Sequence, residues 1–287
     1  MNRIVLLVIM VLGVHNAKAQ DLKAFNIFTS SGIASNWSDF IENASNSDVV
    51  FFGEQHNDPV SHWLELKLAE SLFKIKENHL VLGAEMFESD NQRTIDEYLS
   101  GIIVQKNFES EMRLWPNYKT DYKPLLEFAV DNKLPFVATN IPRRYANLVY
   151  RKGFEGLESL SKDAKKDIAP APIAYDATLP GYKAMMEGMD PGHVSENLPK
   201  AQAVKDATMA YFISENMRKN GCFIHYNGAY HSDNKEGILW YLQKLKPKAK
   251  LFTISVVSQE SIDKLDNSYF NKADFIIVVP EDFTKTY

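Results

Sequence analysis

Short apolar runs alternate with helical patterns along most of this 287-residue chain. The run at 48–52 (DVVFF) precedes a segment with Leu64, Leu68 and Leu72 on one helical face. Five more strand-like runs lie at 79–87, 134–139, 221–227, 251–257 and 275–279. Because such alternation is typical of βα units, we predict an α/β fold. Its central sheet of five to six strands is expected to be mainly parallel and flanked by helices.

Two local patterns predict where helices begin. Asp58-Pro59 supplies an N-cap and a proline at the first helical position after the first predicted strand. Ser89-x-x-Gln92 is a capping-box pattern, which predicts a helix running to about Leu99.

The segment 151–199 interrupts this alternation with many charges, glycines and prolines and no strand-like run. We predict a helical insertion there, lying over the C-terminal edge of the strands. No internal repeat, proline-rich linker or low-complexity tract divides the chain. Residues 20–287 are therefore expected to form a single domain that carries this insertion.

Residues 1–19 have the pattern of a cleaved signal peptide. An apolar run at 4–14 precedes Ala17-Lys18-Ala19, which is an A-x-A cleavage pattern. Eleven residues are too few to span a bilayer, so no transmembrane segment is expected after cleavage. The protein is expected to be exported and to be periplasmic or secreted.

Charge and cysteine content narrow the kinds of partner and covalent link that we expect for this protein. Removal of Arg3 and Lys18 with the signal leaves 30 basic and 37 acidic side chains, a net charge of −7. Since no Lys/Arg cluster forms a basic stripe, we expect no nucleic-acid partner. Cys222 is the single cysteine, so the sequence has neither a disulfide pair nor a lipid-anchor cysteine in the signal.

Polar side chains follow four of the predicted strands. In an open α/β sheet, ligands bind beyond the carboxyl ends of the strands, where loops and helix N-termini meet. Two of these exits share the pattern Gly-x-x-His, at 53–56 and 228–231. We expect glycine to let the chain turn sharply out of each strand. The exits together contribute Glu54, His56, Glu85, Asn140, Arg143, Asn227 and His231.

Imidazole with carboxylate allows two kinds of chemistry at these exits. The set suits Zn, Mn or Fe, and the same groups can act as general base and acid without a metal. The alternative is that Glu54 and His56 merely cap the helix that begins near Asp58.

The predicted helix 201–220 carries polar residues on one face. Gln202 and Asp206 are four positions apart, and Met209 follows three positions later. That face could cover the site or be solvated, and the residues alone favour a solvated face.

These residues resemble the ChaN-like haem-binding uptake family, which is grouped with the Tiki and TraB proteins. The matching pieces follow one another in the expected order: FFGEQHNDPVSH (51–62), LVLGAEMFESDNQ (80–92), DYKPLLEFA (121–129), VATNIPRR (137–144), AQAVKDATMA (201–210) and GAYHSDN (228–234). For ChaN-like proteins the resemblance implies haem binding and iron acquisition, with tyrosine on the haem iron and a dimer that stacks two haems. For Tiki-like relatives it implies a metal-dependent protease that uses His56, His231 and Glu85. Erythromycin esterases are more distantly similar.

A haem site needs an axial ligand, an apolar slot and cationic groups for the propionates. We take Tyr182 and His193, both in the insertion, as candidate ligands and Arg143 as a candidate propionate partner. The nearby Met185, Met186 and Met189 could instead be core residues of an amphipathic helix.

The preferred interpretation is an exported haem-binding protein of haem or iron uptake, with a homodimer left open. The alternative is a metal-dependent hydrolase, a peptidase or an esterase, with Glu54, His56, Glu85 and His231 as catalytic residues. In that case His56, Glu85 and His231 would hold Mn, Zn or Fe. A third interpretation is a binding protein that captures another small ligand without chemistry.

Overall fold

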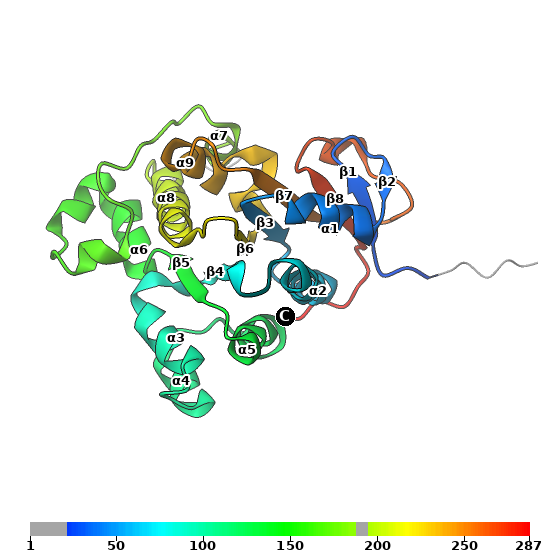
Figure 1. Ribbon diagram of the computed structural model, residues 1–287. Helices are drawn as coiled ribbons and strands as arrows, with labels where there is room; N and C mark the ends of the chain where they lie inside the picture. Colours follow the sequence, from blue (N-terminus) through cyan, green and yellow to red (C-terminus); the bar gives the residue numbers. More distant parts are fainter. Residues whose placement is uncertain (1–21, 188–194) are drawn as a thin grey trace, which may run out of the picture.

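The computed structural model describes residues 22–187 and 195–287 and has one eight-stranded sheet at its centre (Figure 1). The strand order is β2-β1-β8-β7-β3-β6-β4-β5. All six predicted strands are present and pair in parallel. They are β3 (Val49–Glu54), β4 (Leu80–Glu88), β5 (Phe136–Asn140), β6 (Cys222–Gly228), β7 (Leu251–Gln259) and β8 (Phe275–Pro280).

The expectation of five to six strands was too low, because two further strands extend one edge of the sheet. β1 (Asn26–Thr29) pairs antiparallel with β8, and β2 (Ala34–Ser35) pairs antiparallel with β1. Strands of four and two residues are too short to show a period of two in the sequence. They form because the outer edge of β8 would otherwise leave its backbone groups unpaired.

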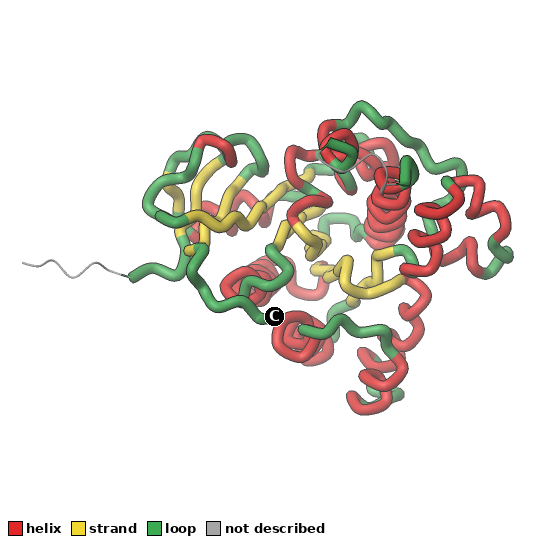
Figure 2. The backbone as a smooth tube through the Cα atoms, turned by 180° about the vertical axis from the view of Figure 1, so that it is seen from behind, coloured by secondary structure: helices red, strands yellow, loops and turns green. Residues whose placement is uncertain are grey.

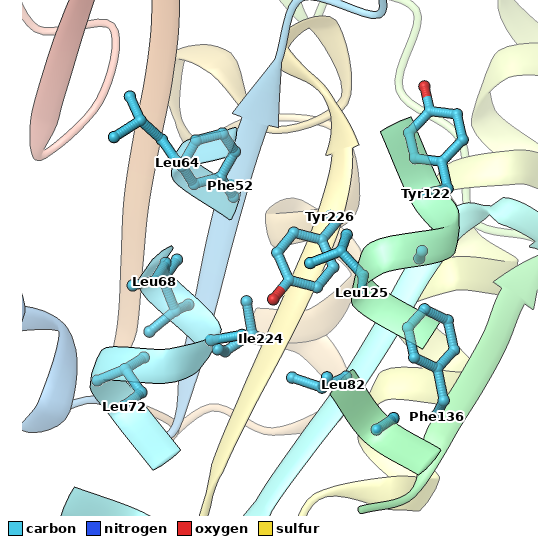
Figure 3. Close-up of a cluster of buried hydrophobic side chains, with 14 of the residues drawn as sticks. Phe52, Leu64, Leu68, Leu72, Leu82, Tyr122, Leu125, Phe136, Ile224 and Tyr226 are labelled. Carbon is cyan, nitrogen blue, oxygen red and sulfur yellow. The ribbon is translucent and has the colours of Figure 1, made fainter. Parts of the chain in front are cut away.

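Helices cover both faces of the sheet, as the two opposite views show (Figures 1 and 2). One apolar core packs α2 and α5 on the strand residues that include Phe52, Leu82 and Tyr226 (Figure 3). The second core packs α8 and α9 on residues of opposite parity, such as Phe51 and Phe223. The α-helices are α1 (Trp37–Ser45), α2 (Pro59–Lys76), α3 (Gln92–Leu99), α4 (Gln105–Glu111), α5 (Lys123–Asn132), α6 (Arg143–Lys152), α7 (Pro180–Ala184), α8 (Leu198–Asn216) and α9 (Ile238–Leu245).

Both predicted helices form, and α3 ends at Leu99 as expected, but only one of the two predicted caps is confirmed. The Asp58 side chain accepts from the Ser61 amide at 2.9 Å, with Pro59 at the first helical position. The predicted capping box does not form, because Ser89 Oγ donates to the Asp167 carbonyl at 2.6 Å. Gln92 Oε1 instead accepts from the Ala138 amide of β5 at 2.6 Å, so this side chain joins α3 to the sheet.

The described part of the predicted insertion contains short helical turns and irregular chain. The turns are Phe154–Ser159, Ala164–Asp167 and α7. Leu157 and Ile168 pack in a small apolar cluster with Ala146 of α6 and Val204 of α8. The predicted signal at 1–19, His193 and Met189 lie outside the described residues. Among the helices that are described, none has the length and apolar character needed to cross a bilayer.

The two Gly-x-x-His motifs pack against each other at the carboxyl ends of β3 and β6. These strands are parallel neighbours, and Glu54 is in register with Gly228. A Cβ on Gly53 would lie 2.9 Å from both the Ala229 Cα and the Ile254 carbonyl oxygen. A Cβ on Gly228 would lie 2.6 Å from Nε2 of His56. Neither glycine is among the positive-φ residues, so close packing and not a sharp turn requires them here.

We expect Gly53→Ala to lower the free energy of unfolding by about 1–3 kcal/mol, because the added methyl group meets backbone atoms that cannot move aside. Urea denaturation would measure this loss. Gly181→Ala is the matched control, because its Cβ would meet a side-chain oxygen of Glu236 at 3.0 Å and no backbone atom at that distance. An equal loss in both variants would contradict the packing argument.

Candidate functional site

A pocket of about 930 Å³ opens at the carboxyl ends of β3, β4, β5 and β6. Its lining includes residues from all four predicted strand exits: Glu54, His56, Glu85, Asn140, Arg143 and His231. Asn227 does not line it, because its amide is buried and donates to Ser232 Oγ at 3.0 Å. The expectation that the exits converge at one sheet edge is therefore confirmed for six of seven side chains.

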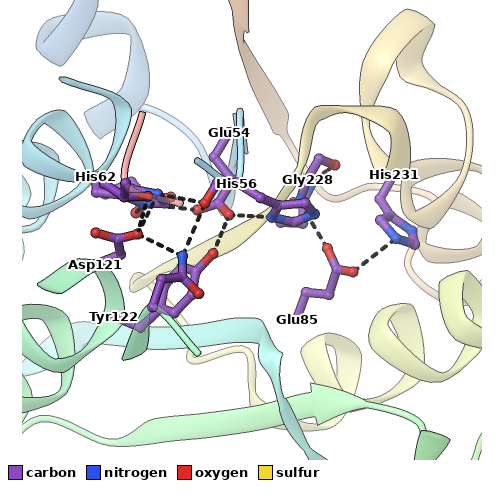
Figure 4. A network of polar contacts seen from close by, with 12 residues as sticks. Glu54, His56, His62, Glu85, Asp121, Tyr122, Gly228 and His231 are labelled. Carbon is purple, nitrogen blue, oxygen red and sulfur yellow. Dashed lines mark hydrogen bonds and ion pairs between the residues drawn. The ribbon is translucent and has the colours of Figure 1, made fainter. Parts of the chain in front are cut away.

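His231 lies between the carboxylates of Glu85 and Asp206 in the pocket wall, and Figure 4 shows its contact with Glu85. Its Nε2 is 3.1 Å from Oε1 of Glu85, and its Nδ1 pairs with Oδ1 of Asp206. Glu85 Oε2 also accepts from the Gly228 amide at 2.8 Å. Burial opposes charging, but attraction to Glu85 and Asp206 outweighs it and raises the pKa of His231 to about 10. Against the same burial, attraction to His231 lowers the pKa of Glu85 to about 2.

His56 pairs with a second buried glutamate of the pocket lining, Glu54. Its Nδ1 is 2.5 Å from Oε1 of Glu54, and that oxygen also accepts from the Tyr122 hydroxyl at 2.8 Å. Burial lowers the pKa of His56, but the hydrogen bond to Glu54 outweighs it, so the net shift is upward. The alternative that Glu54 and His56 merely cap α2 is wrong, because Asp58 is the N-cap.

A further buried group lies behind Glu54, and sequence reasoning missed it. His62 Nδ1 is 3.1 Å from Oε2 of Glu65 and 3.4 Å from Oε2 of Glu54. Asp121 lies on the other side of the ring, 3.4 Å from Nε2. The available signal was the spacing of His62 and Glu65, which puts both on the first turns of α2 after the Asp58 cap.

The face of α8 that carries Gln202 and Asp206 covers the site, so the expectation of a solvated face was wrong. Asp206 is only 1% exposed and Gln202 7%. Gln202 Nε2 is 3.0 Å from Nδ1 of His231. Polarity alone predicts exposure to solvent, whereas the Asp206 carboxylate is buried because it accepts from the buried His231.

The three candidate haem residues differ in their burial and in their hydrogen-bond partners. Tyr182 is 3% exposed and donates to Oδ2 of Asp206 at 2.8 Å. Burial and the Asp206 charge strongly raise its pKa, which opposes the phenolate form. Arg143 lines the pocket, and its guanidinium also donates to Glu88. His193 lies outside the described residues. The assignments of Tyr182 and His193 as haem ligands stay predictions.

Two other tyrosines line the pocket and were missed, since nothing in the sequence marks them. Tyr150 comes from α6, and Tyr230 lies within the second Gly-x-x-His motif. Tyr230 is 47% exposed, and its hydroxyl donates to the Gly181 carbonyl.

Together, a mostly parallel sheet and a carboxylate and histidine pocket at its carboxyl edge define an α/β protein with a ligand or substrate site between strand exits. The chain belongs to the family described as haem-binding uptake, Tiki superfamily, ChaN, whose model matches residues 40–242. The family expectation is thus confirmed.

Two known proteins resemble the chain in different ways. A solved structure, described as cofacial heme binding to ChaN of Campylobacter jejuni, is similar with a TM-score of 0.66 at 16% identity. The match covers 91% of this chain and 99% of that one, and it shows the fold. Protein RETICULATA-RELATED 5, chloroplastic, of Arabidopsis thaliana is 24% identical over 194 residues, or 63% of this chain. The chain spans about a quarter of that relative, 26% of its length.

The His231 network should make stability depend on pH. The pKa of His231 is about 10 in the folded protein, against 6.5 for the unperturbed group, so its charge stabilises the fold fully below pH 6.5. This contribution is lost as pH rises from 6.5 to about 10, at up to about 1.4 kcal/mol per pH unit. Urea unfolding at several pH values should show a correspondingly shallower alkaline decline in His231→Gln. His79 is exposed, so the free energy of unfolding of His79→Gln should decline with pH as it does in the unmodified protein. Equal slopes in the unmodified protein and both variants would refute the role assigned to His231.

Proposed function

We propose that this protein binds haem in the pocket at the carboxyl edge of the sheet and acts in haem or iron uptake after export. The observation that carries the proposal is the pocket itself, which offers apolar walls, phenols and cations together. Its volume of about 930 Å³ is at the upper end of the 300–1,000 Å³ typical of ligand sites. Membership of a family described as haem-binding supports the same ligand.

The lining residues fit the chemical requirements of haem. Trp115, Ile141 and Leu198 supply apolar surface for a porphyrin. Arg143 and Lys205 supply positive charge for propionates, which the net negative charge of the whole chain does not provide. The bound iron would supply Lewis acidity, for which a phenolate is a suitable hard donor.

Among the phenols, Tyr230 is the best placed to hold iron, with Tyr150 second. Both line the pocket, whereas Tyr182 does not and its hydroxyl is engaged by Asp206. Partial burial also raises the pKa of Tyr230, so the iron itself must favour the phenolate. By analogy with the cofacial haems of the Campylobacter protein, we include in the proposal a homodimer in which two pockets face each other.

Addition of ferric haem should shift the Soret band and produce a tyrosinate charge-transfer band. We expect Tyr230→Phe to remove that band and to weaken binding about tenfold or more, equivalent to at least about 1.4 kcal/mol. Absorbance titration measures both effects, and Tyr287→Phe, outside the pocket, is the control. Loss of the band only in Tyr182→Phe would favour the sequence-based ligand. An unchanged haem spectrum with the unmodified protein would refute haem binding.

Hydrolysis is the second candidate function, because two carboxylate-paired histidines face the same pocket. His56 with Glu54 and His231 with Glu85 have the geometry of acid and base groups that act on a bound substrate or water. Arg143 and Asn140 could stabilise negative charge that develops on a carbonyl oxygen.

A divalent metal bound by the pocket wall would supply Lewis acidity to such a reaction. However, among the described residues His56, Glu85 and His231 do not form a group whose ligand atoms all lie within 4.8 Å of one another. The geometry therefore supports proton transfer better than this metal assignment.

If hydrolysis is the activity, Glu85→Gln should lower kcat/KM by about 100-fold or more, because the charge that pairs with His231 is removed. A panel of p-nitrophenyl esters and fluorogenic peptides would measure the rates, with and without added Mn²⁺ or Zn²⁺. Glu70→Gln on the outer face of α2, where Glu70 pairs with Lys67, is the control. Turnover that survives in Glu85→Gln would exclude the proposed group.

A further inference from the structure

The group behind Glu54 is distinct from the wall that lines the pocket. Glu54, His62 and Glu65 come from the end of β3 and the first two turns of α2. The side chains of Glu54 and Glu65 are fully buried and that of His62 is 4% exposed. His62 and Glu65 do not line the pocket, whereas Glu54 does. The three residues therefore form a buried cluster of which only Glu54 lines the pocket, and Figure 4 shows its members Glu54 and His62.

The spacing within this cluster is that of ligands around one small ion. One ligand atom from each of the three side chains lies within 4.8 Å of the other two. His62 Nδ1 is 3.4 Å from Glu54 Oε2 and 3.1 Å from Glu65 Oε2. Two ligands that are each about 2.1 Å from a tetrahedral ion lie about 3.4 Å apart. An ion could thus be bound with little movement of the side chains.

Two carboxylate oxygens in the cluster lack hydrogen-bond partners. Glu54 Oε2 and Glu65 Oε1 are both buried without one. Among the described residues, no lysine or arginine forms an ion pair with either glutamate. Because burying two carboxylates is costly, a positive charge stabilises them here, and either a protonated His62 or a bound metal ion can supply it.

The orientation of the His62 ring turns Nδ1 toward the two glutamates, where a neutral ring could donate a lone pair to a metal ion. Its Nε2 lies 3.1 Å from the His56 carbonyl oxygen, to which only a protonated ring nitrogen can donate. A neutral imidazole therefore carries its hydrogen on Nε2, and its Nδ1 lone pair points at the two glutamates. Histidine ligands of metals commonly donate their other ring N–H to a backbone carbonyl in this way.

We propose that Glu54, His62 and Glu65 bind a divalent first-row transition metal in a closed, structural site. The donors would be Nδ1 of His62 and one carboxylate oxygen each of Glu54 and Glu65, and the two carboxylates would neutralise the charge of the ion. The metal fastens α2 to the end of β3. It also holds Glu54, whose other oxygen pairs with His56 in the pocket.

The test measures metal in the full chain, purified without chelator and without a polyhistidine tag. Mass spectrometry of haem-free protein should find about one equivalent of metal, and reconstitution with Zn²⁺, Mn²⁺ or Co²⁺ should restore it after chelation. Glu65→Gln keeps the side-chain volume and should reduce the metal content about tenfold or more. Glu70→Gln, on the same helix, should retain it. Circular dichroism checks that each variant is folded.

A second measurement serves if Glu65→Gln does not fold. Co²⁺ added to the unmodified protein should give visible d–d absorption that Zn²⁺ displaces, and the milder His62→Gln should remove it. If the unmodified protein contains no metal and binds no Co²⁺, protonation and not a metal neutralises the buried carboxylates. That result would overturn the proposal. Metal lost in Glu85→Gln and His231→Gln but kept in Glu65→Gln would assign it to the pocket wall instead. None of these outcomes depends on haem binding or on hydrolysis.

Discussion

The structure depends most on the reciprocal packing of two Gly-x-x-His motifs on neighbouring parallel strands. Gly53 leaves room for the backbone of the second motif, and Gly228 leaves room for the His56 ring of the first. A side chain at either position would push β3, β6 or the ring away, because the nearest atoms lie under 3 Å from its Cβ. This close approach brings both histidines to one sheet edge and lets the Gly228 amide donate to Glu85.

The same packing creates a row of alternating acidic and basic groups across the sheet. From α2 it runs through Glu65, His62, Glu54 and His56, and beyond Gly228 it continues through Glu85, His231 and Asp206. Each buried ion pair costs solvation energy that its partner only partly returns, so a row of this length is not explained by stability alone. Perturbed titratable groups of this kind gather at functional sites. The part of the row from Glu54 to His231 lines the pocket proposed for haem or substrate, and the end at α2 is the proposed metal cluster.

Sequence patterns predicted some parts of this arrangement and missed others for physical reasons. The six parallel strands and the Asp58 cap follow from local apolar runs and capping chemistry, which act over a few residues. The Ser89 capping box failed because its residues found partners elsewhere, in the Asp167 carbonyl and the β5 backbone. Asp206 was expected to be solvated, yet it is buried against His231, 25 positions away in the sequence. Such pairs depend on which helix lies over which strand, and periodicity within one helix does not contain that information.

By itself, the sequence determined the α/β class, the order of the parallel strands along the chain and the strand exits that carry the polar residues. It also contained the motifs that mark the family. Only the tertiary structure decided which exits face one another, because the order β7-β3-β6-β4 in the sheet differs from the order in the chain. It likewise decided that Tyr182 is engaged by Asp206 while Tyr230 lines the pocket, and that His62 joins Glu54. The reason is that burial and pairing of charged groups are set by contacts between distant segments, which no local pattern encodes.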